Sequence, residues 1–154
     1  MGKVTKTGDN NMFIGEYSHT IDSKKRLAIP SKFRKELGKK AVITRGLDNC
    51  LVVYPTKEWE SLAKKLGSLP ATQVDARKFS RIMLSGAMDV NLDNLGRILI
   101  PDYLKNYASL KKNVVICGLF NRLEIWNESN WQDYKKKTEM AVGDIAEGLK
   151  ELGL

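Results

Sequence analysis

The first strand-forming segment of the chain is recognised by its alternation of apolar and polar residues. Alternation through residues 17–21 is typical of a strand with one buried face. Turn-forming residues follow, and residues 27–29 are a short apolar segment that Pro30 closes. The pattern therefore predicts a β-hairpin whose tip is the sequence DSKKR at residues 22–26.

The same pattern returns later in the chain. FIGEYSHTIDSKKRLAIP at residues 13–30 matches LSGAMDVNLDNLGRILIP at residues 84–101, including a DxxxR motif and the final proline. After one inserted residue, VITRGLDNCLVVYPTKEW at residues 42–59 matches VVICGLFNRLEIWNESNW at residues 114–131, including a GLxN turn. Residue types with different physical roles recur in one order, so the chain contains one structural unit twice.

Each copy continues with a short helix and two further strands. Pro30 and Pro101 precede polar residues, which is a typical start of a helix, here SKFRKEL and DYLKNYA. Apolar, β-branched segments then flank the GLxN turn of each copy. The predicted unit is strand, hairpin tip, strand, short helix, strand, turn, strand. The fold class is therefore mixed α+β and mainly β.

Helical periodicity predicts how the two copies are connected. Residues 56–66, 75–84 and 129–152 place apolar residues at helical spacing, whereas residues 1–11 lack an apolar face. The predicted organisation is a disordered leader at 1–11, a first unit at 12–60, linker helices at 61–82, a second unit at 83–131 and a C-terminal helix at 132–154.

The charge of the chain points to a polyanionic partner. Lys and Arg number 26 against 18 Asp and Glu, a net charge of +8. This excess favours nucleic acid or an anionic membrane surface. Nine basic residues lie between positions 22 and 45, against two acidic ones. They are Lys24, Lys25, Arg26, Lys32, Arg34, Lys35, Lys39, Lys40 and Arg45.

The DxxxR motifs have two interpretations, which the residues alone leave open. In the structural one, the Asp accepts backbone donors in its own turn and the Arg pairs with it or with a symmetry-related copy. In the functional one, the basic hairpin enters the major groove of DNA, which a two-stranded ribbon fits. The candidate DNA-binding residues are Asp22, Lys24, Lys25, Arg26, Arg34, Asp93 and Arg97.

The two tips are not electrostatically equivalent. The second reads DNLGR, with Leu95 and Gly96 where the first has Lys24 and Lys25. We therefore expect the first tip to supply most phosphate contacts, and the second to be a tighter, glycine-assisted turn with a more structural role.

Other kinds of site find little support in the sequence. Cys50 and Cys117 lie in apolar runs and are expected to be buried free thiols, and His19 is the single histidine. A nucleophile with a base, a glycine-rich phosphate loop and a metal-ligand cluster are not recognisable. We therefore expect no enzyme, no metal, no cofactor and no small-molecule substrate. The aromatic residues recur at equivalent positions of both copies, which favours packing over base stacking.

The sequence predicts a cytoplasmic protein that does not bind membranes. A signal peptide and an apolar run long enough to span a bilayer are not recognisable. An alternative function is an interaction module or ring-forming scaffold whose basic face touches a membrane or a protein. A basic amphipathic helix would distinguish it, but the basic residues concentrate around the first hairpin instead.

Together, the segment FIGEYSHTIDSKKRLAIPSKFR, the paired DxxxR motifs and the sequences GLDNCLVVYP and GLFNRLEIW resemble the MraZ family, over residues 12–131. The resemblance implies a fold like that of the AbrB and SpoVT proteins, with two swapped-hairpin β-barrel half-units packed as a pseudo-dimer. It also implies a ring-shaped homo-oligomer at the nucleoid. Such rings bind short promoter repeats upstream of the division and cell-wall gene cluster, usually as repressors. Only Asp22, Arg26, Asp93 and Arg97 carry over from the family motif.

Overall fold

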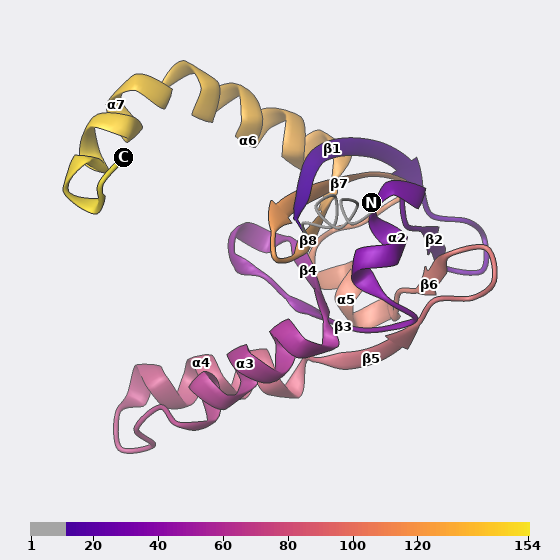
Figure 1. Ribbon diagram of the computed structural model, residues 1–154, viewed down its shortest axis with the longest axis horizontal. Coiled ribbons are helices and arrows are strands. Elements are labelled where there is room, and N and C mark those ends of the chain that lie inside the picture. The colour runs from indigo at the N-terminus through magenta and orange to yellow at the C-terminus, as the bar shows by residue number, and fades with distance from the viewer. Residues whose placement is uncertain (1–11) are drawn as a thin grey trace, which may run out of the picture.

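The computed structural model describes residues 12–154 (Figure 1). The predicted leader at residues 1–11 lies outside this range. The first copy contains β1 (Phe13–Thr20), β2 (Arg26–Ala28), α2 (Ser31–Leu37), β3 (Lys40–Arg45), η2 (Leu47–Asn49), β4 (Leu51–Pro55), α3 (Thr56–Gly67) and α4 (Val74–Ser85). The second copy contains β5 (Met88–Asn91), β6 (Arg97–Leu99), α5 (Asp102–Tyr107), β7 (Asn113–Phe120), β8 (Leu123–Asn127), α6 (Glu128–Met140), α7 (Val142–Gly148) and η3 (Lys150–Leu152).

The order of elements confirms the α+β class and the duplication. Strand, tip, strand, helix, strand, strand and helix follow one another in both copies. The strands from both copies form one six-stranded antiparallel sheet, in the order β1-β7-β8-β4-β3-β5, and a two-stranded sheet of β2 and β6. In the described part of the chain β1 and β5 are the edges of the large sheet, so the strands do not close into a barrel.

The predicted hairpins differ from the structure in their strand pairing. Eight residues of β1 pair with β7 of the second copy, from Phe13 opposite Phe120 to Thr20 opposite Asn113. Within the first tip, an isolated bridge between Ile21 and Leu27 joins the two arms of the turn. The purely local hairpin is therefore wrong, because a three-residue β2 cannot satisfy the backbone groups of an eight-residue β1. The exchange of strands between copies is the swapped arrangement that the resemblance implies.

The pairing of β2 with β6 lies on a local two-fold axis. Leu27 is opposite Ile98, and both side chains are fully buried. The Ile29 N–H donates to the carbonyl of Gly96, and the Ile100 N–H donates to that of Lys25, both at 2.9 Å. One hydrophobic core therefore spans both copies. Each tip is also hydrogen-bonded to the residue that comes directly after β2 or β6 in the other copy.

A smaller cluster on the large sheet contains both cysteines. Cys50 and Cys117 are buried free thiols, as predicted, and they pack with Val115 and Trp126. Burial raises the pKa of Cys50 far above its usual range and that of Cys117 to about 12. The Trp131 ring packs against that of Trp126, with the ring centres 5.2 Å apart. These side chains therefore serve packing.

Two helical arms extend from the large sheet at the end of the molecule opposite the tips, as Figure 1 shows. One arm is α3 with α4, and the other is α6 with α7. The Thr44 hydroxyl and the Arg45 guanidinium of β3 donate to the carbonyls of Met83 and Ile82 in α4, at 2.9 and 3.0 Å. The first arm is therefore bonded to the sheet at its base.

Candidate nucleic-acid interface

The first tip is organised by the carboxylate of Asp22. Its Oδ1 accepts the backbone N–H groups of Lys24, at 2.8 Å, and of Arg26, at 2.9 Å. Its Oδ2 accepts the Nε–H of Arg26 at 2.9 Å. An Asp that accepts donors from the residues after it stabilises a tight turn. The spacing of four in DxxxR therefore places both ends of the motif within hydrogen-bond distance across the tip.

The second tip repeats this geometry. Oδ1 of Asp93 accepts the N–H groups of Leu95 and Arg97, each at 2.9 Å, and Oδ2 accepts the Nε–H of Arg97 at 2.7 Å. The structural interpretation of DxxxR is thus confirmed in both copies. Because each ion pair uses Nε, the terminal nitrogens of the two guanidinium groups stay outside it.

The fourth residue of each tip adopts a left-handed backbone conformation. Lys25 has φ of 65° and Gly96, at the equivalent position, has φ of 74°. Glycine adopts this conformation without penalty, whereas another residue loses about 1–2 kcal/mol. Gly96 is therefore the favoured residue for the turn, and the first tip carries a lysine despite the strain.

Hydrogen bonding lowers the pKa of both tip carboxylates. For Asp22 the main cause is the N–H of Arg26, and for Asp93 it is the N–H of Arg97. The side-chain hydrogen bond from Lys25 likewise lowers the pKa of Asp102 in α5. These three groups favour their charged form in the folded chain.

The lowered pKa values predict a specific pH dependence. A carboxylate whose pKa is lower when folded stabilises the fold above its unfolded pKa, and this contribution is lost as the pH falls through the folded value. The double variant Asp22→Asn/Asp93→Asn should therefore be less stable than the parent at pH 7. The difference should shrink below about pH 4, where the unfolded carboxyls are protonated.

Urea unfolding at pH 7, 4 and 2.5 checks this expectation, with Asp133→Asn on the exposed face of α6 as the control. A stability difference that stays constant across this pH range would contradict the role assigned to the two carboxylates.

Each tip also contacts the helix that follows the other tip. Nζ of Lys25 lies 2.8 Å from Oδ2 of Asp102, at the start of α5. In the symmetric position, Gly96 lies so close to the Arg34 side chain of α2 that a Cβ would overlap it. The Nε–H of Arg34 donates to the carbonyl of Ile29 at 2.7 Å. Arg34 is therefore fixed by its own copy and packs against the second tip.

These contacts create a basic groove beside the first tip, with a volume of about 560 Å³. Its polar lining comes from both copies: Thr20 of β1, Asp22, Ser23 and Lys25 of the tip, and Lys105, Lys111 and Lys112 of the second copy. Four of these side chains are lysines, and the one carboxylate is already bonded within its turn.

A matching groove of about 500 Å³ lies beside the second tip. It combines Asp93, Asn94 and Gly96 of that tip with Arg34, Lys35 and Lys39 of the first copy. The tip that lacks lysines is thus flanked by cations of the other copy. The first tip is flanked by three cations of the other copy as well, so the electrostatic difference between the tips is still that of Lys24 and Lys25.

The structure brings the predicted DNA-binding residues to one end of the molecule, but they differ in exposure and in ion pairing. Lys24 is exposed, and its side chain has no ion pair within residues 12–154. Arg26 and Arg97 are half-buried and paired. The sequence interpretation missed Lys105, Lys111 and Lys112. The repeat offset could have found them, because in the sequence alignment they match Arg34, Lys39 and Lys40 of the first copy.

Metal ligands and membrane-spanning helices would indicate other kinds of binding. Across residues 12–154, His, Cys, Asp and Glu side chains form no group of three that could hold a metal ion. The helices there include none whose length and apolar character would suit a membrane span.

Comparison with known proteins agrees with the duplication and with the resemblance. A family model described as "MraZ protein, putative antitoxin-like" matches the chain twice, at residues 12–82 and 83–151. Proteins named transcriptional regulator MraZ from Caldanaerobacter subterraneus subsp. tengcongensis and from Halothermothrix orenii are 48% and 52% identical to it over 143 residues. Each alignment covers 93% of this chain and 100% of the relative. The chain therefore belongs to the MraZ family.

Proposed function

We propose that the protein is a sequence-specific DNA-binding transcriptional regulator whose two tips contact double-stranded DNA. The observation that carries the proposal is the pair of ordered DxxxR tips at one end of the molecule, each flanked by a basic groove. The names of the relatives support regulation of transcription. The proposal involves no catalysis, cofactor, small-molecule substrate or membrane.

In the proposed complex, the tips divide their chemistry between the two parts of the motif. The terminal nitrogens of Arg26 and Arg97 are outside their ion pairs, so they can donate to a guanine edge or to a phosphate. Asp22 and Asp93 position these arginines instead of contacting DNA, because a carboxylate repels phosphate. Lys24 adds a charge at the first tip that suits phosphate contacts, whereas the charge of Lys25 is already paired with Asp102.

The finer parts of the proposal concern the target and the direction of regulation. The family resemblance favours short promoter repeats upstream of the division and cell-wall gene cluster, with repression as the outcome. Such a regulator works on the nucleoid in the cytoplasm. A repeated target needs several tips in register, which one chain with a single pair of tips does not supply.

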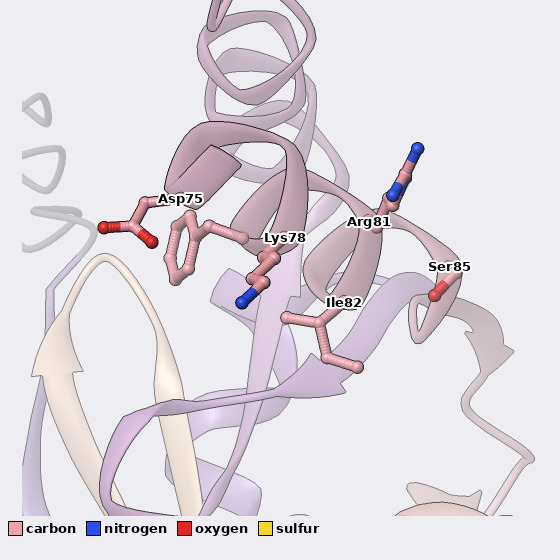
Figure 2. Close-up of a pocket in the computed structure, with 6 residues that line it drawn as sticks. Asp75, Lys78, Arg81, Ile82 and Ser85 are labelled. Carbon is pink, nitrogen blue, oxygen red and sulfur yellow. The ribbon is translucent and has the colours of Figure 1, made fainter. Parts of the chain in front are cut away.

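We further propose that copies of the chain assemble into a ring through their two arms. The apolar face of α4 includes Phe79 and Ile82, which are 40% and 46% exposed. It lines a shallow hollow of about 810 Å³ that also contains basic residues, and Figure 2 shows Lys78 and Ile82 on one side of the helix.

The proposed occupant of this hollow is the C-terminal arm of the next copy. Val142 and Ile145 of α7 are 59% and 44% exposed, and Asp144 supplies negative charge beside them, whereas Glu147 is paired with Lys150. The charge of Asp144 complements that of Lys78 and Arg81, which outnumber Asp75 in the lining of the hollow. Two different surfaces meeting head to tail close into a ring when the rotation between copies permits it.

Fluorescence anisotropy tests the function directly. The protein is titrated onto a labelled duplex from upstream of its own gene and onto a scrambled duplex of equal length, at two salt concentrations. We expect tighter, salt-sensitive binding to the upstream duplex, and a loss of this preference in Arg26→Ala. A loss of about 1–3 kcal/mol in discrimination corresponds to removal of one bidentate base contact.

Equal and weak binding to both duplexes would contradict sequence-specific recognition. The basic end of the molecule would then be a general polyanion surface, as in an interaction module or scaffold.

A further inference from the structure

We propose that the groove beside the first tip binds the DNA sugar-phosphate backbone through Lys105, Lys111 and Lys112, so that each DNA contact of the first tip is built from both copies of the repeat. This inference rests on the proposed DNA-binding function and adds to it a phosphate-binding site that lies outside the DxxxR motifs.

The first argument is how firmly the second copy is attached to the first tip. The N–H of Ile21 donates to the carbonyl of Lys112 at 2.8 Å, immediately before the Asp22 turn begins. On the other side of the groove, Lys25 is paired with Asp102 of α5. The lysine-bearing loop before β7 and the helix α5 therefore keep a fixed position relative to the tip.

The second argument concerns charge. Lys25, Lys105, Lys111 and Lys112 line one groove of about 560 Å³. Asp22 is engaged by its own turn and Asp102 is paired with Lys25, so the excess positive charge comes from Lys105, Lys111 and Lys112. Like charges concentrated in one cleft focus a positive potential, which raises the local concentration of anions. A polyanion is therefore the ligand that this groove fits.

The third argument distinguishes phosphate from base recognition. Lys111 and Lys112 are exposed and lie beside the tip, whereas the arginines are in the tip turns themselves. If the tip enters a groove of the duplex, side chains flanking it face the strands that border that groove. Lysine acts on phosphate as a point charge, without reading sequence. The groove should therefore add affinity and salt dependence but no specificity.

The repeat offers an internal parallel. The sequence alignment matches Lys105 with Arg34. In the structure Lys112 takes the place of Lys39, since their carbonyls accept the N–H groups of the equivalent residues Ile21 and Leu92. Both Arg34 and Lys39 line the groove beside the second tip. Each tip therefore has cations of the other copy beside it, although only the first tip contains lysines of its own.

The test compares two double variants of the full chain that lose equal charge. Lys111→Gln/Lys112→Gln removes two groove lysines, and Lys136→Gln/Lys137→Gln removes two exposed lysines of α6, far from the tips. Binding to the upstream and scrambled duplexes is measured by anisotropy across a series of salt concentrations. Far-UV circular dichroism and thermal melting verify that both variants fold.

We expect the groove variant to show a shallower dependence of log K on log salt, by about 0.9 in slope for each phosphate that it no longer neutralises. The slope of the α6 variant should stay close to that of the parent. The ratio of affinities for the two duplexes should not change in either variant. Equal slopes for the groove and α6 variants would overturn the inference.

The same data separate this inference from the proposed function. If the parent prefers its upstream duplex but the two variants behave alike, the groove proposal alone fails. If the parent shows no preference but the groove variant has the shallower slope, the sequence-specific function fails and the phosphate-binding groove stands. If the parent binds neither duplex, both fail.

Discussion

Replacement of Leu27 by alanine is expected to lower the free energy of unfolding by about 2–5 kcal/mol, because it leaves a cavity in a close-packed core. Leu27 is fully buried and lies opposite Ile98 at the two-fold axis between the copies. Both tips depend on this pairing, since the hydrogen bonds that join each tip to the other copy lie directly beside it. The variant should therefore loosen the end of the molecule that contains the tips as well as the core.

Leu99→Ala is the matched control for this prediction. Leu99 belongs to β6, within the same two-stranded sheet, but its side chain is 55% exposed. A surface substitution of this kind changes stability by less than about 0.5 kcal/mol. Urea unfolding of the parent and both variants at equal protomer concentration provides the measurement, since assembly also contributes to stability. Similar losses for Leu27→Ala and Leu99→Ala would show that the axis does not hold the copies together.

Disruption of the arm contact should have the largest effect on DNA binding. Phe79→Ala/Ile82→Ala removes the apolar side chains of the α4 hollow, and alanine preserves helix propensity. We expect sedimentation velocity to show smaller assemblies than those of the parent. Linked weak contacts gain on the order of 10²- to 10⁴-fold in avidity on a repeated target, and the separated copies should lose most of this gain.

Two controls separate assembly from local damage. Lys64→Ala/Lys65→Ala alters exposed residues of α3 in the same arm and should leave assembly unchanged. A duplex with a single repeat should be bound almost equally by the parent and by the Phe79/Ile82 variant, since avidity does not contribute there. An unchanged sedimentation profile of that variant would refute the proposed α4 contact.

These predictions assign separate roles to the two ends of the molecule. In the proposed function, the end with the tips makes the DNA contacts, and the end with the arms sets how many tips are presented together. Affinity for a single site is then a property of the tips and grooves. Affinity for a repeated site is a property of the assembly. Variants at one end should leave the measurement for the other end largely intact.

Much of the local structure follows from the sequence, because it depends on contacts between residues close together in the chain. The helix α2 begins at Ser31 and ends at Leu37, as the proline and apolar spacing predict. The DxxxR turn also forms locally, since the Asp22 carboxylate accepts from groups two and four residues away and its carbonyl accepts the N–H of Lys25. The left-handed backbone conformation at Gly96 is likewise local, because it belongs to the turn that contains this residue.

Strand pairing and the composition of the grooves depended on tertiary structure. Periodicity gives the face that a strand buries but not its partner, and β1 found its full-length partner in β7, about a hundred residues away by the register of Phe13 with Phe120. This exchange brings Lys111 and Lys112 beside Asp22. Their charge was visible in the sequence, but their position beside the first tip was not, because only the packing of one copy on the other creates the groove.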